Sequence, residues 1–101
     1  MGIGNKKSEI NAIKKGEGRL SMSTPGGDAE LLYKIEGNIM SIYHTFVPES
    51  ERGKGMAEKL ADEAFDMARE KHLLVRPDCP YILHYLEKHK DAKTMAVDPE
   101  I

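Results

Sequence analysis

Apolar and polar residues alternate with a period of two through the first half of the chain, as in half-buried β-strands. The alternation is clearest where Leu20 and Met22 share one side of a short segment, and where Leu31, Tyr33 and Ile35 repeat the pattern further on. Turn-forming residues separate these segments, namely Pro25-Gly26-Gly27-Asp28 and Gly37-Asn38. We therefore expect strands at residues 17–24, 29–35 and 39–47, with a further short strand at residues 10–13.

The second half changes to helical spacing. After Pro48, which cannot donate to a strand ladder, small and apolar residues recur on one face of a predicted helix. These are Ala57, Leu60, Ala61, Ala64, Met67 and Ala68. A short apolar run at residues 73–75 predicts a buried strand, and a second helix is expected from Asp78 or Pro80 to Lys90. An edge strand is a further expectation at residues 95–97.

This order of elements predicts an α+β domain. Antiparallel strands come first, and a strand–loop–helix–strand–helix unit follows. A right-handed crossover makes the strand at residues 73–75 parallel to the strand at residues 39–47. The whole chain, residues 1–101, is expected to form one domain, with residues 1–8 as a flexible tail.

A glycine loop joins the third predicted strand to the first helix. Gly53 and Gly55 lie just before that helix, whose first N–H groups lack helical partners and carry partial positive charge. Such an end binds phosphate, and glycine lets the phosphate approach the backbone closely. The Rossmann pattern fails because Glu58 occupies the third glycine position, and the Walker pattern fails because Lys54 precedes Gly55. The alternative is a tight strand-to-helix turn that binds nothing.

The loop Ser50-Glu51-Arg52-Gly53-Lys54-Gly55 resembles the pyrophosphate loop of the GNAT acetyltransferase superfamily, written [Q/R]-x-x-G-x-[G/A]. Ser50 departs from the first position of that pattern. The segments His44-Thr45-Phe46-Val47-Pro48 and Cys79-Pro80-Tyr81 resemble those of the small, single-domain GNAT-like subfamily. The resemblance covers about residues 17–90. It implies a minimal GNAT fold: a mostly antiparallel sheet with a central splayed parallel strand pair and two packed helices.

Acetyl-CoA is the cofactor that this resemblance implies, held where the two parallel strands splay apart. The end of the third strand would polarise the thioester carbonyl, and the loop would hold the pyrophosphate. The implied cofactor-binding residues are Phe46, Val47, Arg52, Gly53, Lys54, Gly55, Met56 and Ala57. The implied activity is acetyl-CoA-dependent N-acetyl transfer to an unidentified amine. The alternative is a catalytically silent acyl-CoA-binding or protein-interaction module, which the absence of the usual flanking helices favours.

Three residues are candidates for catalysis. GNAT enzymes often take their base from a glutamate in the third strand, but residues 39–47 contain none, so His44 is the candidate base. A strand histidine that is merely hydrogen-bonded is an equal alternative. Cys79, at a helix start, is a candidate nucleophile for a ping-pong route, or else it lines the acyl site or packs as a small hydrophobe. Tyr85 resembles the tyrosine that protonates the departing thiolate; Tyr81, one turn earlier, shares its face, and core packing is the alternative for both.

Composition excludes several other classes of function. A net charge of −2 and the absence of Trp argue against nucleic-acid and membrane-surface partners. No apolar run has transmembrane length, no signal peptide is recognisable, and the single Cys79 suits a reducing compartment, so we expect a cytoplasmic protein. Cys79, His84 and His89 are spaced so that each is rotated by roughly 140° from the last on a helix, so we expect no metal site. The oligomeric state stays open.

Overall fold

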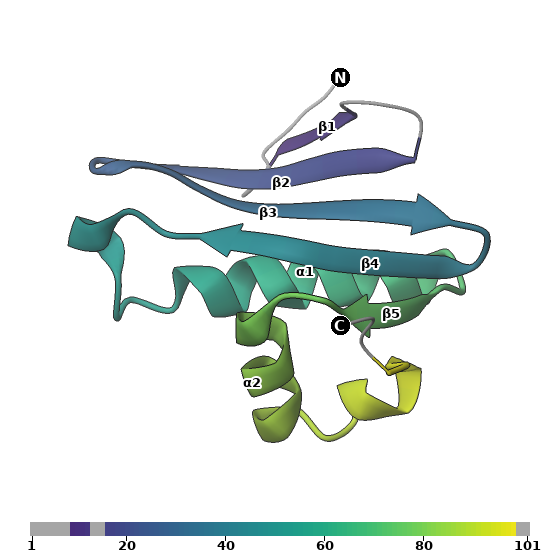
Figure 1. Ribbon diagram of the computed structural model, residues 1–101. Coiled ribbons are helices and arrows are strands. Elements are labelled where there is room, and N and C mark those ends of the chain that lie inside the picture. The colour runs from purple at the N-terminus through teal and green to yellow at the C-terminus, as the bar shows by residue number, and fades with distance from the viewer. Residues whose placement is uncertain (1–8, 13–15, 99–101) are drawn as a thin grey trace.

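The computed structural model describes residues 9–12 and 16–98 of the chain, and Figure 1 shows its elements. The predicted flexible tail at residues 1–8 lies outside the described residues. Five strands form one sheet in the order β1-β2-β3-β4-β5. Their bounds are Glu9–Ala12 for β1, Glu17–Thr24 for β2, Gly27–Glu36 for β3, Ile39–Phe46 for β4 and Leu74–Pro77 for β5.

The first four strands pair antiparallel, each with the next, as the alternating pattern predicted. One detail of the prediction was wrong: Gly27 and Asp28 belong to β3 and not to the turn. The pair Thr24↔Gly27 closes the β2–β3 ladder, so the connection is only two residues long. The hydroxyl of Thr24 accepts a hydrogen bond from the Gly26 N–H at 3.1 Å and donates to the Gly27 carbonyl. The threonine side chain therefore ties the tight turn together.

A β-bulge interrupts the β3–β4 ladder at Tyr43. Tyr33 pairs with Ile42, whereas Leu32 pairs with His44, so β4 holds one extra residue at this point. A bulge shifts the alternation of side chains, and every residue of β4 after Tyr43 consequently changes face. The sequence pattern alone did not predict it.

The strands β4 and β5 pair in parallel over four residue pairs, from Ile39↔Leu74 to Ile42↔Pro77. Beyond Ile42, β4 continues for four residues to Phe46, while the segment that follows β5 turns away into a helix. The two strands therefore separate, as the α+β prediction with a splayed parallel pair required. On the outer side of β5, an isolated bridge joins Val75 to Ala96.

Two α-helices complete the domain: α1 at Met56–Glu70 and α2 at Pro80–Lys88. Both contribute to one hydrophobic core, and α1 runs across one face of the sheet (Figure 1). Short 3₁₀ helices occupy Glu49–Glu51 (η1) and Ala92–Met95 (η2). The prediction of an edge strand at residues 95–97 was wrong, because η2 extends to Met95. Two contacts join this segment to β5: the Ala96 bridge and a 2.9 Å hydrogen bond from the Val97 N–H to the Val75 carbonyl.

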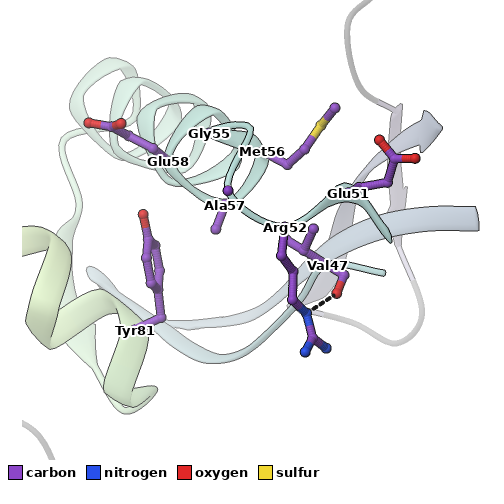
Figure 2. A pocket seen from close by; sticks show the side chains of 9 residues that line it. Val47, Glu51, Arg52, Gly55, Met56, Ala57, Glu58 and Tyr81 are labelled. Carbon is purple, nitrogen blue, oxygen red and sulfur yellow. Dashed lines mark hydrogen bonds between the residues drawn. The ribbon is translucent and has the colours of Figure 1, made fainter. Parts of the chain in front are cut away.

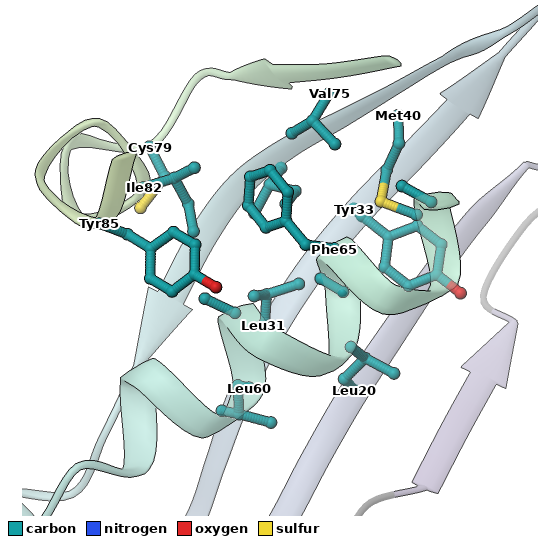
Figure 3. Packing of buried hydrophobic residues seen from close by; sticks show 14 of the residues in the cluster. Leu20, Leu31, Tyr33, Met40, Leu60, Phe65, Val75, Cys79, Ile82 and Tyr85 are labelled. Atoms are coloured by element: carbon teal, nitrogen blue, oxygen red, sulfur yellow. The ribbon is translucent and has the colours of Figure 1, made fainter. Parts of the chain in front are cut away.

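The core lies between the sheet and the two helices (Figure 3). On β3, Ala29, Leu31 and Tyr33 face it, and each is at most 6% exposed. Opposite them, α1 presents Phe65 together with fully buried alanines at positions 61, 64 and 68. Small side chains let the helix backbone approach the sheet closely. The other face of the sheet carries Arg19, Glu30 and His44, and neither α1 nor α2 covers it.

Replacing Ala64 with leucine should destabilise the protein, because the side chain is fully buried and the added methylenes have nowhere to go. Overpacking of this kind costs about 1–3 kcal/mol in the free energy of unfolding. The matched control is Lys59→Leu, which places the same side chain on the exposed face of α1 and should stay within about 0.5 kcal/mol of the wild type. Urea denaturation measures both. Equal stabilities would contradict the close packing of α1 on the sheet.

Candidate functional site

The glycine loop has a backbone conformation that requires glycine. Gly53 and Gly55 have φ angles of 83° and 81°, in the left-handed region that side chains with a Cβ rarely adopt. Gly55 is the N-cap of α1, and its carbonyl accepts the first helical hydrogen bond, from the Lys59 N–H at 3.0 Å. A Cβ built on either glycine meets no protein atom within 4 Å. The loop is therefore open on its outer side, where a ligand can approach the backbone.

A pocket of about 220 Å³ lies between this loop, the end of β4 and the start of α2 (Figure 2). Six of the eight predicted cofactor-binding residues line it: Val47, Arg52, Gly53, Gly55, Met56 and Ala57. The N–H groups at the start of α1 belong to the same segment, so the pocket combines apolar side chains with unpaired helix donors. That combination suits an anionic group attached to an uncharged arm.

Arg52 fastens the loop to the end of β4. Its Nε donates a hydrogen bond to the Val47 carbonyl at 2.8 Å, which Figure 2 shows as a dashed line. Its guanidinium carbon lies 5.9 Å from the centroid of the Phe46 ring, within range of a cation–π contact. Phe46 does not line the pocket itself, but its ring contacts Arg52, which does.

Lys54 forms an ion pair that the sequence did not suggest. Its Nζ lies 3.2 Å from Oε1 of Glu51, whose side chain is only 7% exposed. The Ser50 hydroxyl approaches the other oxygen of Glu51 at 3.5 Å. Glu51 lines the pocket and Lys54 does not, so the positive charge closest to the pocket lining comes from Arg52 and from the helix end.

Three residues that line the pocket were not among the predicted cofactor-binding residues: Glu51, Glu58 and Tyr81. Charged loop and helix residues such as Glu51 and Glu58 are usually solvated, so nothing in their spacing marked them. Tyr81 had a signal, because it shares a helix face with Tyr85. Its side chain enters the pocket from α2 (Figure 2). Burial raises the pKa of Tyr81, and the nearby Glu58 and Asp62 carboxylates raise it further.

Tyr85 does not line this pocket. Its ring stacks on Phe65 at a centroid distance of 5.2 Å and on His89 at 4.0 Å. Its hydroxyl donates a 2.5 Å hydrogen bond to Asp62 on α1, and the residue is 4% exposed. Burial, followed by the Asp62 hydrogen bond and charge, raises the pKa of Tyr85 strongly. These contacts join α1 to α2, and a catalytic role for Tyr85 stays a prediction.

Cys79 lies where the parallel strands separate. It is the N-cap residue of α2, the residue is 6% exposed, and Pro80 follows it at the first helical position. Its Sγ lies 3.3 Å from the Thr45 hydroxyl, across the opening between β4 and α2. This position, beside the end of β4, is compatible both with a nucleophile and with a residue that lines the acyl site.

His44 projects from the face of the sheet that α1 and α2 do not cover. Its side chain is 44% exposed, and its Nε2 lies 3.3 Å from Oε2 of Glu30 on β3. The three predicted catalytic residues thus have partners on three different elements: Glu30 on β3, Thr45 on β4 and Asp62 on α1. Cys79 contacts Thr45, the residue next to His44. Tyr85 lies apart from both Cys79 and His44, in the contact between α1 and α2.

Residues 9–12 and 16–98 contain neither a candidate metal site nor a candidate membrane-spanning helix. No group of three or more His, Cys, Asp or Glu side chains in this part of the chain could hold a metal ion. Neither is any helix there both long enough and apolar enough to cross a membrane.

Comparison with known proteins adds a family match. The family model described as GCN5-related N-acetyl-transferase matches residues 19–95. The protein NATD1 of Gallus gallus and that of Mus musculus are each 39% identical to this chain over 62 residues, which is 60% of this chain and 56% of theirs. NATD1 of Homo sapiens is 39% identical over 62 residues, 55% of its own length. The chain thus matches little more than half of these relatives.

A solved structure supports the fold. The solution NMR structure of a GCN5-like candidate N-acetyltransferase from Staphylococcus aureus superimposes with a TM-score of 0.61 and 23% identity. The match covers 95% of this chain and 94% of the other. At this identity the likeness establishes the fold alone, and it agrees with the predicted α+β architecture.

The Tyr85 contacts predict how stability depends on pH. Because the pKa of Tyr85 is raised in the folded state, the folded protein keeps this proton above about pH 10, where an unfolded chain loses it. The free energy of unfolding should therefore fall as pH rises through this range. Tyr33 and Tyr81, whose pKa values burial also raises, add to that slope.

Tyr85→Phe should remove part of this slope and leave the rest. It keeps the ring stacking but loses the hydrogen bond to Asp62, at a cost of about 1 kcal/mol at neutral pH. Urea unfolding of both proteins at a series of pH values measures the two slopes. Identical slopes would contradict the raised pKa of Tyr85.

Proposed function

Because this chain belongs to the GCN5-related N-acetyltransferase family, we propose that it binds acetyl-CoA and transfers the acetyl group to an amine. The observation that carries the proposal is the glycine loop between β4 and α1, with two left-handed glycines and the pocket that it lines. The chemistry of the loop suits the pyrophosphate of CoA: helix N–H donors, Arg52, and no Cβ in the way. Lys54 would join them on release from Glu51.

The exposed edge of β4 supports a path for the pantetheine arm. Pairing with β5 ends at Ile42, so within the described residues the β5 side of Tyr43–Phe46 has no strand partner. The amide groups of pantetheine can pair with such an edge as an added strand would. A backbone N–H near Phe46 and Val47 would then polarise the thioester carbonyl, as the family resemblance implies.

Two routes of transfer are open to these residues. In the direct route, the amine nitrogen attacks the thioester carbonyl, the C–S bond breaks, and His44 takes the proton that the amine loses. In the covalent route, the Cys79 thiolate attacks first and CoA leaves. The amine then attacks the new thioester, the C–S bond to Cys79 breaks, and the Cys79 sulfur takes the proton that the amine loses. In either route the departing CoA thiolate takes up a proton. Tyr81 is better situated than Tyr85 to supply it, because Tyr81 lines the pocket.

The alternative function is that of a silent acyl-CoA-binding module. It is favoured by the lack of a glutamate in β4 and by the low exposure of Cys79. The two functions differ in one measurement: release of free CoA thiol with a panel of amines occurs only in the enzyme. We also propose a cytoplasmic location, because the free thiol of Cys79 suits a reducing compartment.

Gly55→Val should weaken acetyl-CoA binding at least tenfold, because a β-branched side chain at positive φ distorts the loop and covers the helix donors. Gly37→Val is the matched control. Gly37 also has a positive φ, of 61°, and open space around it, but it lies in the β3–β4 turn away from the pocket. Both variants should lose about 1–3 kcal/mol of stability from backbone strain, yet only Gly55→Val should lose affinity.

Isothermal titration calorimetry with acetyl-CoA measures the affinities, and urea denaturation the stabilities. Wild-type affinity in Gly55→Val would refute the loop as the cofactor site. An equal loss of affinity in Gly37→Val would attribute the effect to general destabilisation.

If the covalent route operates, incubation with acetyl-CoA should add one acetyl group to Cys79, which hydroxylamine should remove. Cys79→Ser should still bind acetyl-CoA but acquire no hydroxylamine-labile label, and its rate of transfer should collapse. Intact-protein mass spectrometry and thiol release give both results. An unlabelled wild type together with full transfer by Cys79→Ala would exclude the covalent route and leave Cys79 as a lining residue.

A further inference from the structure

A carboxylate on the neighbouring strand β3 lies beside His44. Glu30 lies on the open face of the sheet, where Oε2 is 3.3 Å from Nε2 of His44. We propose that Glu30 is a positioning residue that sets the tautomer and orientation of His44 for proton transfer. This inference rests on the proposed function, in which His44 accepts a proton from the amine.

The β-bulge at Tyr43 brings the pair together. Ile42 faces the core and is fully buried, and with regular alternation His44 would face the core too. The extra residue instead puts His44 opposite Leu32, on the face that carries Glu30. Glu30 itself is opposite Phe46, so His44 and Glu30 are diagonal neighbours on adjacent strands, within reach of each other. Bulges re-aim side chains in this way beside active sites.

Glu30 is itself held in place. Its Oε1 accepts a 2.7 Å hydrogen bond from Nε of Arg19 on β2, and Nη2 of Arg19 lies 3.5 Å from Asp28. The hydrogen bond to Glu30 raises the pKa of Arg19, so the guanidinium stays charged and the carboxylate stays paired. Oε1 of Glu30 thus anchors the side chain to Arg19 on β2, and Oε2 lies beside Nε2 of His44. The charged groups that face His44 through this network are Arg19, Asp28 and Glu30.

The chemical consequence concerns which ring nitrogen holds the proton. A carboxylate only accepts hydrogen bonds, so we expect the neutral imidazole to carry its hydrogen on Nε2, which lies 3.3 Å from Glu30. Nδ1 then carries the lone pair and accepts the proton of the amine. After transfer both ring nitrogens carry hydrogen and the ring is a cation. The effect is one of orientation, since the pair is part-exposed and water screens its charges.

The test is Glu30→Gln, with Glu36→Gln as the matched control. Glu36 lies on the same strand, exposed, and pairs only loosely with Lys34, at 3.9 Å. In Glu30→Gln, Arg19 should bind the amide oxygen and turn the NH₂ group toward Nε2 of His44. That arrangement favours the opposite tautomer, with the hydrogen on Nδ1.

Two measurements decide the outcome. The ¹⁵N NMR shifts of His44, at a pH where the imidazole is neutral, should show Nε2–H in the wild type and in Glu36→Gln, and a shift toward Nδ1–H in Glu30→Gln. With an accepted amine, kcat should fall at least about tenfold in Glu30→Gln, less than the ~10²–10⁴ expected for His44→Gln. The Kd for acetyl-CoA should be unchanged in all variants.

A wild-type His44 in the Nδ1–H form, or a Glu30→Gln variant with the wild-type tautomer and rate, would overturn the inference. The tautomer readout needs no turnover, so the two proposals fail differently. A wild type that transfers acetyl to no amine would refute the proposed function and, with it, the catalytic part of this role. Normal turnover that Glu30→Gln leaves intact would refute the role of Glu30 alone.

Discussion

The separation of β4 from β5 is the constraint on which the rest of this structure depends. Pro77 has no N–H to donate, and the ladder that begins at Ile39↔Leu74 ends at Ile42↔Pro77, with a last bond from the Asp78 N–H to the Ile42 carbonyl at 3.0 Å. Past this point, in the part of the chain that the structure describes, β4 pairs with β3 alone, while the segment after β5 turns into α2. The opening that results is bounded by Thr45 on one side and Cys79 on the other.

The pocket beside this opening owes little to net charge. Glu51 and Glu58 line it, and the ion pair with Glu51 occupies Lys54. An anion would therefore be attracted by the N–H groups at the start of α1 and by Arg52, with the helix dipole adding to both. On the proposed function, a chain with a net charge of −2 would then bind the pyrophosphate without a basic patch. The two glycines would contribute more to that binding than Lys54 does.

Two neighbouring residues of β4, His44 and Thr45, have side chains on opposite faces of the sheet. The bulge at Tyr43 sends His44 toward Glu30 on the open face, whereas Thr45 points to Cys79 on the helix side. The base of the direct route and the nucleophile of the covalent route would therefore lie on opposite faces of the sheet. Single substitutions at His44 and at Cys79 can separate the two routes.

The sequence by itself determined the strands β2 to β4, both helices, the glycine loop and the α+β class, because each depends on local periodicity, on proline or on glycine. The family resemblance carried by that loop agrees with the family match over residues 19–95. Only the tertiary structure decided the bulge at Tyr43, the Glu30–His44 pair and the entry of Tyr81, in place of Tyr85, into the pocket. These features depend on register between strands and on how α2 packs against α1. Neither leaves a periodic trace in the sequence, because partners such as Glu30 and His44 come from different strands.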